Sequence, residues 1–144
     1  MKIYAIRKIK FDAGHRVVNH ESKCRTLHGH EYWAHIYAKS NTGLDPLGRV
    51  IDFSVIKDRI GGWIDDHFDH NMIIWKEDPD LEWLERCDGA KKIFVLDKNP
   101  TAENIAEYLI KHICPSMLEG TGIKVPRIRL YETTNCYVEV EIDC

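Results

Sequence analysis

The sequence predicts an α+β fold in which an antiparallel sheet is covered on one face by two helices. Near each end of the chain, two segments alternate between apolar and polar residues with the period of a β-strand. Between these pairs, two segments repeat apolar residues every three or four positions, as amphipathic helices do. The resulting order, β-β-α-α-β-β, favours an antiparallel sheet with both helices packed on one side.

The first two strands are predicted over residues 2–11 and 31–39. In the first, apolar residues such as Ile9 and Phe11 occupy odd positions, and lysines occupy several even ones. In the second, Tyr32 begins an apolar parity that continues through alternate residues. This alternation is typical of strands with one face against a core and the other toward solvent.

Each of the two helices is predicted to start at a residue that commonly caps helix N-termini. Asp52 precedes an apolar stripe over residues 53–64, and Thr101 precedes a second stripe over residues 102–113. Pro115 follows the second stripe. We expect it to end that helix, because proline lacks the N–H group of a helical residue.

The last two strands are predicted over residues 128–132 and 136–142, with a threonine-containing turn between them. Residues 76–99, between the helices, contain charged and turn-forming stretches, a short helical pattern over 80–86 and a strand-like run over 93–96. The pattern assigns no role to this insert.

Length and composition favour a single domain over residues 1–144. The chain has 44% apolar and 30% charged residues, an ordinary balance for a protein that buries a core. Its net charge of −3 gives no general attraction to nucleic acids. Its apolar runs are too short for a membrane span, and its N-terminus alternates where a signal peptide is continuously apolar. We therefore expect a cytoplasmic protein without nucleic-acid or membrane partners.

Five cysteines without a Cys-x-x-Cys pair argue against a disulfide framework. Four of them stand in helical, strand or terminal contexts where a small buried residue is expected. These four are Cys87, Cys114, Cys136 and Cys144. Cys24 differs, because it lies four residues before His28.

The segment His28-Gly29-His30 predicts a metal site. Residues two apart on an extended chain point to the same side, so both imidazoles can reach one ion, with Gly29 leaving room between them. His15, at the end of the first strand, has the parity to supply a third nitrogen from a neighbouring strand. Three imidazoles without a fourth side-chain ligand are typical of catalytic zinc, which keeps one position open.

Four further residues are candidates for the chemistry around that metal. Cys24 beside a cation suits a general base, although the sequence leaves open that it is a fourth zinc ligand. In the pair Asp69-His70, a carboxylate can orient the imidazole for proton transfer. Glu132, at a strand end, shares the parity of core residues, and a carboxylate that points beneath the helices needs a specific partner.

Several motifs occur together in an order that resembles one enzyme family. They are Phe11-Asp12-Ala13-Gly14-His15, Cys24-Arg25-Thr26-Leu27-His28-Gly29-His30, Val50-Ile51-Asp52-Phe53, Asp69-His70, Pro100-Thr101-Ala102-Glu103-Asn104 and Tyr131-Glu132-Thr133. The set resembles the signature of the 6-pyruvoyl-tetrahydropterin synthase and 6-carboxy-tetrahydropterin synthase family and spans nearly the whole chain. The resemblance implies a tunnelling fold, which has the β-β-α-α-β-β order predicted above.

The resemblance also implies roles for individual residues. It implies Zn²⁺ at His15, His28 and His30, Cys24 as proton acceptor, and His70 with Asp69 as a proton relay. Glu132 matches the glutamate that anchors the pterin ring and joins that relay, and Thr133 is a supporting contact. A carboxylate suits the anchoring task because the ring presents adjacent N–H donors.

The substrate that the resemblance implies is 7,8-dihydroneopterin triphosphate. In the carboxy branch of the family, triphosphate and acetaldehyde are released and 6-carboxy-5,6,7,8-tetrahydropterin remains, on the route to queuosine and other 7-deazaguanines. The spacing Cys-x3-His-Gly-His resembles the carboxy branch, whereas Asn71 stands where that branch often has another histidine. The alternatives are the pyruvoyl product and a non-enzymatic zinc- or pterin-binding module.

The resemblance further implies a homo-oligomer, a hexamer of two stacked trimers with active sites between subunits. A four-stranded sheet leaves open edges, which neighbouring copies would cover. The triphosphate site is unassigned, although Arg16, Lys23 and Arg25 lie near the metal motif in the sequence.

Overall fold

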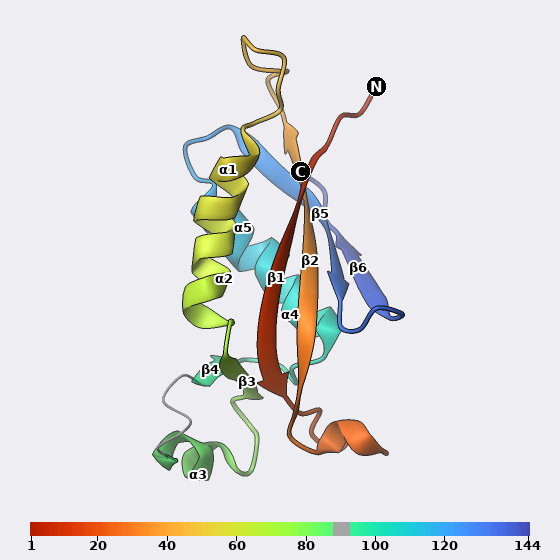
Figure 1. Cartoon of the computed structure of the whole chain (residues 1–144), viewed down its shortest axis with the longest axis vertical. Helices are drawn as coiled ribbons and strands as arrows, with labels where there is room; N and C mark the ends of the chain where they lie inside the picture. Colours follow the sequence, from red (N-terminus) through yellow and green to blue (C-terminus); the bar gives the residue numbers. More distant parts are fainter. Residues whose placement is uncertain (88–92) are drawn as a thin grey trace.

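A six-stranded sheet in the order β4-β3-β1-β2-β5-β6 forms the centre of the computed structural model, which describes residues 1–87 and 93–144 (Figure 1). The strands are β1 (Ala5–His15), β2 (His28–Ser40), β3 (Asn71–Trp75), β4 (Ile93–Leu96), β5 (Ile123–Tyr131) and β6 (Tyr137–Glu141). Strands β1, β2, β5 and β6 match the four predicted strands and pair antiparallel. The other two make the sheet mixed, because β3 pairs parallel to β1 and β4 pairs parallel to β3.

The sequence did not predict β3, whereas β4 coincides with the strand-like run over residues 93–96. Within β3, the run from Met72 to Ile74 is continuously apolar and has no alternation, and Ile73 and Ile74 are both buried. A continuous apolar run of this kind is typical of strands that are covered on both faces. The partners of β3 also lie far along the chain, so no local turn signal marks it.

Two long helical stretches cover one face of the sheet (Figure 1). The first consists of α1 (Phe53–Ile56), a π-helical turn (Lys57–Gly61) and α2 (Gly62–His67). The second consists of α4 (Ala102–Tyr108), a π-helical turn (Leu109–Ile113) and α5 (Cys114–Met117). Both predicted caps are present: the side chain of Asp52 accepts from the Ser54 N–H at 2.9 Å, and that of Thr101 accepts from the Asn104 N–H at 3.2 Å.

Pro115 does not end the second helical stretch, contrary to the expectation from sequence. It lies in the first turn of α5, directly after the π-helical turn Leu109–Ile113, and the helix continues to Met117. A π-helical turn widens the backbone and changes its hydrogen-bond spacing, so a missing N–H there interrupts less than in a regular helix. In the insert, α3 (Leu81–Arg86) matches the predicted short helix, and residues 88–92 lie outside the described residues.

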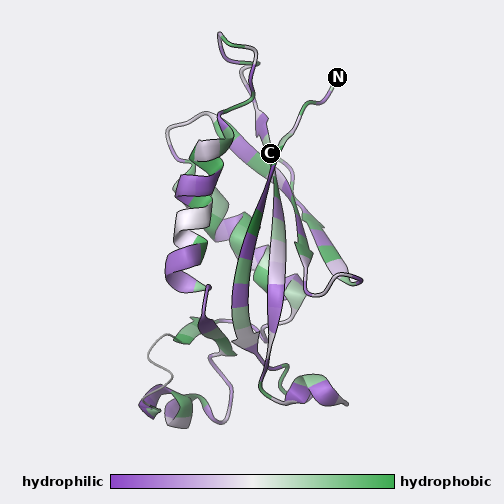
Figure 2. Cartoon of the chain, viewed as in Figure 1, coloured by the Kyte–Doolittle hydropathy of each residue, from purple (hydrophilic) through white to green (hydrophobic). Residues whose placement is uncertain are grey.

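The core lies between the sheet and both helical stretches. It includes Phe11 and Tyr32 from the strands, Ile60 from the first helical stretch and Ile105 from the second, all at most 1% exposed. Figure 2 shows hydrophobic and hydrophilic residues alternating along the strands, as a sheet with one covered face requires. The prediction of an α+β fold with two helices on one face is therefore confirmed.

The five cysteines are free. Cys114 is buried, as expected, but Cys136 and Cys144 are exposed and Cys87 is only partly buried. The expectation of buried residues was wrong for these three, because Cys136 lies in the turn before β6, Cys144 is the last residue, and Cys87 lies just after the short helix α3. In the described part of the chain, no helix combines the length and the apolar character needed to cross a membrane.

Candidate metal centre and substrate pocket

Three histidines meet where β1 ends and β2 begins. The pairing of these strands places His15 opposite His28, and Ala13 opposite His30. Because side chains alternate between the two faces of a strand, all three imidazoles lie on the face that carries the core residue Phe11. Strands β1 and β2 extend beyond the predicted ranges 2–11 and 31–39, so that β1 ends at His15 and β2 begins at His28. All three histidines therefore lie within the two paired strands.

The imidazole nitrogens of these three residues converge. Nε2 of His15 lies 3.1 Å from Nε2 of His28, and one ring nitrogen from each of the three histidines lies within 4.8 Å of the others. Two nitrogens that bind a tetrahedral zinc at ~2.0–2.1 Å are roughly 3.3 Å apart, so this spacing suits a single ion. Among the described residues, the set of converging ligand atoms contains these three histidines alone.

The hydrogen bonds of the imidazoles also suit metal binding. Nδ1 of His15 donates to the carbonyl of Pro100 at 2.7 Å, and Nδ1 of His28 donates to the carbonyl of Thr26 at 2.5 Å. These bonds leave the Nε2 lone pairs free to face the centre. Nε2 of His30 is buried without a hydrogen-bond partner among the described residues, which is costly unless an ion satisfies it. The donor set therefore fits a metal ion.

Burial keeps two of these imidazoles, those of His15 and His30, in the neutral form that binds metals. It lowers the pKa of His15 to about 4, with a smaller contribution from the neighbouring His28 and His30. Burial also lowers the pKa of His30, against the opposing charge of Glu132. At neutral pH, neither side chain has to lose a proton before it binds a cation.

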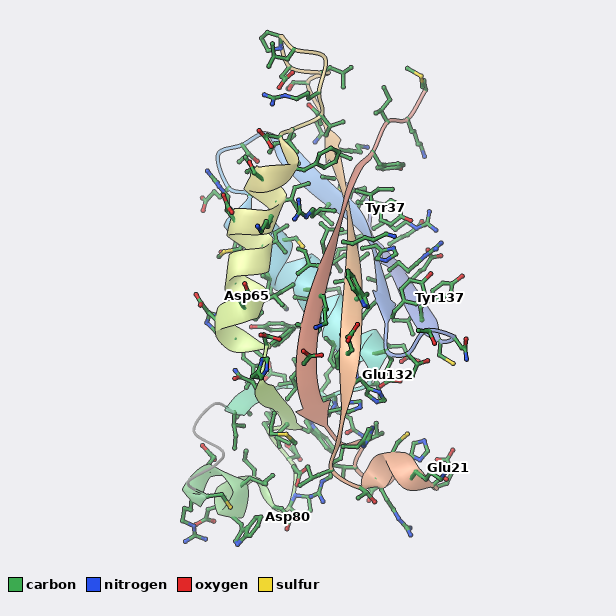
Figure 3. All side chains as sticks on the ribbon, in the orientation of Figure 1. Glu21, Tyr37, Asp65, Asp80, Glu132 and Tyr137 are labelled. Carbon is green, nitrogen blue, oxygen red and sulfur yellow. The ribbon has the colours of Figure 1, made fainter. Side chains whose placement is uncertain are left out.

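Glu132 lies against two of the imidazoles. Its Oε1 atom is 3.3 Å from Nε2 of His15 and 3.5 Å from Nε2 of His30. Glu132 follows β5 directly, at the start of the turn that leads into β6. The carboxylate that the sequence singled out therefore lies beside the histidine cluster. Figure 3 shows Glu132 at the lower part of the sheet, well below Tyr37.

An open hollow of about 700 Å³ adjoins Glu132. Thr133 also lines it, together with the side chains of Trp33, His35 and Tyr131. Its volume lies within the range of small-molecule sites, which join apolar and aromatic walls to a few polar groups. The hydroxyl of Thr133 accepts hydrogen bonds from backbone N–H groups of its own turn, so this side of the hollow is held in place.

Cys24 lies in the loop that joins β1 to β2, within a short 3-10 turn over Lys23–Arg25. Its carbonyl accepts a hydrogen bond from the backbone N–H of Val17 at 2.7 Å, and the residue is partly buried. The loop carries the thiol to the same end of β1 and β2 as the histidines. Cys24 is not a member of the converging ligand set, so a metal ion held by the three histidines alone would keep an open position.

Asp69 and His70 form a second cluster, with Asp12. Oδ2 of Asp69 accepts from Nδ1 of His70 at 2.8 Å, and its Oδ1 accepts from the backbone N–H of Asp12 at 2.8 Å. His70 has a left-handed backbone (φ 60°), and its side chain is 74% exposed. Asp12 precedes His15 by three residues, about 10 Å along a strand. Within one chain, the structure therefore keeps this pair apart from the histidine cluster.

Arg16 is engaged in a partly buried ion pair with two carboxylates, which makes it a poor candidate for a phosphate ligand. Its Nε donates to Oδ2 of Asp78 at 2.8 Å, and its Nη2 binds both Asp78 and Asp80. Burial alone would raise the pKa of Asp78, but the hydrogen bonds and charge of Arg16, together with the hydrogen bond from the Asp80 N–H, outweigh it and hold that pKa below its usual range. Lys23 and Arg25, both exposed beside Cys24, are the remaining candidates for triphosphate.

Space is tight at Gly14, which precedes His15, and not at Gly29, which lies between His28 and His30. A Cβ atom on Gly14 would lie 2.2 Å from Sδ of Met72 and 3.3 Å from the carbonyl of His28. On Gly29, a Cβ atom would meet only the backbone of Ala13, at 3.4 Å. The sequence drew attention to the glycine between two histidines, whereas the close approach involves a strand that it did not predict.

The fold and the histidine cluster agree with one protein family. The model of the family described as 6-pyruvoyl tetrahydropterin synthase matches residues 4–143. The chain belongs to the 6-pyruvoyl tetrahydropterin synthase family, as its motifs indicated. Solved structures confirm the expected tunnelling fold. An uncharacterised protein from Wolinella succinogenes superposes with a TM-score of 0.86 at 22% identity, and the 6-pyruvoyltetrahydropterin synthase of Plasmodium vivax with 0.70 at 18%, each over 99% of both chains.

Curated relatives point to one branch of this family. The chain is 46% identical over 139 residues to the 6-carboxy-5,6,7,8-tetrahydropterin synthase of Rickettsia felis, which covers 96% of this chain and 99% of the relative. A protein of the same name from Aquifex aeolicus is 31% identical over 161 residues, covering 96% of this chain and 98% of that one. Because these relatives are synthases, the prediction that the chain is an enzyme is confirmed.

Proposed function

We propose that this protein is a zinc-dependent 6-carboxy-5,6,7,8-tetrahydropterin synthase that serves queuosine and 7-deazaguanine biosynthesis. It converts 7,8-dihydroneopterin triphosphate and one molecule of water to 6-carboxy-5,6,7,8-tetrahydropterin, acetaldehyde and triphosphate. The observation that carries the proposal is the convergence of three imidazoles beside Glu132, at the edge of a hollow of ligand size. The 46% identity to a relative named for this product supports the carboxy branch.

In this proposal, His15, His28 and His30 hold Zn²⁺ through their Nε2 atoms. When bound, the zinc supplies positive charge that stabilises negative charge developing on the oxygen atoms of the substrate side chain. The carbonyls of Pro100 and Thr26 hold two of the imidazoles in the orientation that binding needs. Three protein ligands leave a position open for the substrate.

The thiol of Cys24 is the base in this proposal, and the pair Asp69 and His70 is the proton relay. Cys24 takes a carbon-bound proton from the side chain of the substrate, and His70 returns one. The bond from Nδ1 of His70 to Asp69 leaves Nε2 of His70 free to exchange protons with the substrate. The hydrogen bonds to Asp12 fix the position of this pair.

Glu132 anchors the pterin ring in this proposal, and Thr133 supports it. The ring presents adjacent N–H donors, which one carboxylate can accept together. Trp33 and Tyr131 give the hollow flat apolar walls of the kind that suit a bicyclic ring. Because Glu132 also lies against His15 and His30, it joins the ring site to the metal site.

We further propose a homohexamer whose active sites form between copies. Two features of the single chain support this arrangement. The pair Asp69 and His70 lies apart from the histidine cluster, and in the part of the chain that the structure describes no strand pairs with the outer edges of β4 and β6. A neighbouring copy would bring its own pair to the cluster. Light scattering of the zinc-loaded protein at micromolar concentration tests the assembly, and the mass of a single chain would contradict it.

The decisive experiment is incubation of the zinc-loaded protein with 7,8-dihydroneopterin triphosphate. We expect the pterin product to have the mass of 6-carboxy-5,6,7,8-tetrahydropterin and acetaldehyde to form in equal amount. Triphosphate release without acetaldehyde would indicate the pyruvoyl synthase. No turnover at all would defeat the synthase proposal.

A Cys24→Ala variant separates an enzyme from a zinc-binding module. If Cys24 is the base, the variant retains one zinc per chain and loses at least ~100-fold in turnover, as expected for a missing general base. If Cys24 is a structural ligand, the variant loses zinc. Metal content measured by mass spectrometry, beside the turnover rate, distinguishes the two.

A further inference from the structure

The loop over residues 16–27, which carries Cys24, has few hydrogen bonds to the rest of the molecule. Its own bonds include those from the backbone N–H of Val17 to the carbonyl of Cys24, and from His20 back to Val17. Beyond the bond between Thr26 and His28, the described residues anchor it by hydrogen bonds at two points only, Arg16 and Val18. The position of the thiol therefore depends on these anchors.

The anchor at Val18 is the side chain of Asn99. Oδ1 of Asn99 accepts from the backbone N–H of Val18 at 2.9 Å, and Nδ2 of Asn99 donates to the carbonyl of Val18 at 3.0 Å. The amide thus satisfies both backbone groups of one residue, as a neighbouring strand would. Val18 is next to Val17, which holds the carbonyl of Cys24, so two hydrogen-bonded steps lead from Asn99 to the residue that carries the thiol.

Asn99 is itself held firmly. Its carbonyl accepts from Nδ2 of Asn104 at 2.8 Å and from the backbone N–H of Thr101 at 2.8 Å, at the N-terminus of α4. The next residue, Pro100, accepts from Nδ1 of His15 at 2.7 Å. One short segment, Asn99–Pro100, therefore contacts both the metal ligand His15 and the loop of Cys24.

From this geometry we infer that Asn99 is a positioning residue, which sets the place of Cys24 relative to the three-histidine site by clamping the backbone of Val18. The inference rests on the proposed role of Cys24 as the base. Catalytic groups must lie within a fraction of an ångström of their productive position, and a loop without a clamp does not hold them there. Asn99 does not need to touch the substrate for this effect.

The test compares Asn99→Ala and Asn99→Asp with Asn41→Ala, a matched control. Asn41 is exposed, in the turn at the other end of β2, and has no side-chain hydrogen bond among the described residues. We expect Asn99→Ala to lower kcat about 10- to 100-fold, with KM changed less than about 3-fold and one zinc per chain retained. Asn99→Asp, which keeps an acceptor for the Val18 N–H, should fall between this variant and the wild type.

Two results would overturn the inference. One is a kcat for Asn99→Ala equal to that of Asn41→Ala. The other is a loss of zinc in proportion to the loss of activity, which would mean that the segment acts through His15. Unchanged melting temperatures in both variants exclude a general loss of structure.

A second measurement does not depend on turnover. The alkylation rate of Cys24 by iodoacetamide, followed by peptide mass spectrometry, is compared with that of the exposed Cys136 in the same chain. We expect Asn99→Ala to change the ratio of the two rates by at least ~3-fold, because thiol reactivity depends on its surroundings. An unchanged ratio would defeat the clamp even if the protein is not a synthase, and a changed ratio without turnover would defeat the proposed function alone.

Discussion

The cluster of His15, His28 and His30 lies on the core face of the sheet and is called the buried cluster below, because His15 is buried and the other two are partly buried. The cluster of Asp12, Asp69 and His70, at the same end of β1, is called the exposed cluster, because the imidazole of His70 is mainly exposed. The first contains imidazoles only, and burial keeps two of them neutral. The second pairs an imidazole with a carboxylate. The same kind of side chain is therefore a candidate metal ligand in one place and a candidate proton carrier in the other, according to its burial and its partners.

The carboxylate of the second cluster is firmly ionised at neutral pH. Burial alone would raise the pKa of Asp69, but the hydrogen bonds from the Asp12 N–H and from His70 outweigh it and hold that pKa below its usual range. An ionised acceptor beside Nδ1 orients the imidazole of His70. In the first cluster, the carbonyls of Pro100 and Thr26 orient the rings without adding a charge.

Removing one imidazole from the buried cluster should have the largest effect. We expect His30→Ala to abolish stoichiometric zinc binding and to lower turnover by at least ~1,000-fold, because the charge that the metal supplies is lost. Metal content by mass spectrometry and turnover are measured together. His112→Ala, an exposed histidine in the second helical stretch, is the control and should keep both. Full zinc content in His30→Ala would contradict the assignment of this ligand.

Removing the imidazole of the exposed cluster should reduce turnover without affecting the metal. We expect His70→Ala to lose about 100-fold in kcat, within the range for a general acid or base, and to retain one zinc per chain. If the site forms between copies, mixing His70→Ala with Cys24→Ala under conditions of subunit exchange should restore activity. Some mixed sites would then contain both native residues. Turnover of the mixture that stays at the level of the separate variants argues for a site within one chain.

The buried cluster should also make the metal-free protein sensitive to acid. The pKa of His15 is about 4 when folded and 6.5 in its ordinary state. Between these pH values the unfolded chain binds a proton that the folded chain excludes, so stability falls as the pH drops from about 6.5 to about 4. His15 contributes on the order of 3 kcal/mol to this fall.

Urea denaturation of the metal-free protein at several pH values in that window measures the effect. His15→Gln removes the titrating group, so the difference between its pH slope and that of the wild type isolates the contribution of His15. Equal slopes for the two proteins would show that burial does not depress this pKa.

Removing a carboxylate partner of Arg16, which follows His15 in the chain, should have the smallest effect, a loss in the free energy of unfolding. Asp78→Ala leaves the partly buried Arg16 with Asp80 as its remaining carboxylate partner, and we expect a loss of about 2–3 kcal/mol in the free energy of unfolding. Asp80→Ala, which removes an exposed carboxylate, should cost less than about 1 kcal/mol. Urea denaturation at pH 7 gives both values. A loss for Asp80→Ala as large as for Asp78→Ala would show that burial is not what distinguishes these carboxylates.

Local signals in the sequence predicted most of the fold. Asp52 and Thr101 cap helices through bonds to residues two or three positions away, so a short window contains the whole interaction. Strand β3 was not predicted, because its partners are distant in the chain and its apolar run does not alternate. The prediction that Pro115 ends the second helical stretch was wrong, because the π-helical turn before it has no marked sequence pattern.

In the candidate site, too, local features could be predicted from the sequence and contacts between distant segments could not. The parity of His15, His28 and His30 on adjacent strands indicated one side of the sheet, and the structure brings these residues together. Contacts that depend on tertiary packing were not predictable: neither the bond from His15 to Pro100 nor the pairing of Arg16 with Asp78 follows from spacing. For the bond from His15 to Pro100, the sequence offered one indication, which is that Pro100 stands just before the helix cap Thr101.

The π-helical turns in the two helical stretches have a consequence for the evolution of chain length. A π-helical turn holds one more residue than the α-helical turn it replaces, so each stretch accommodates an insertion within a buried helix. Removing one residue there would rotate all following residues by about 100° and turn the apolar stripe away from the sheet, unless the turn relaxes to α-helix. Alignments of related chains should therefore show single-residue gaps at 57–61 and 109–113, where core helices otherwise resist them.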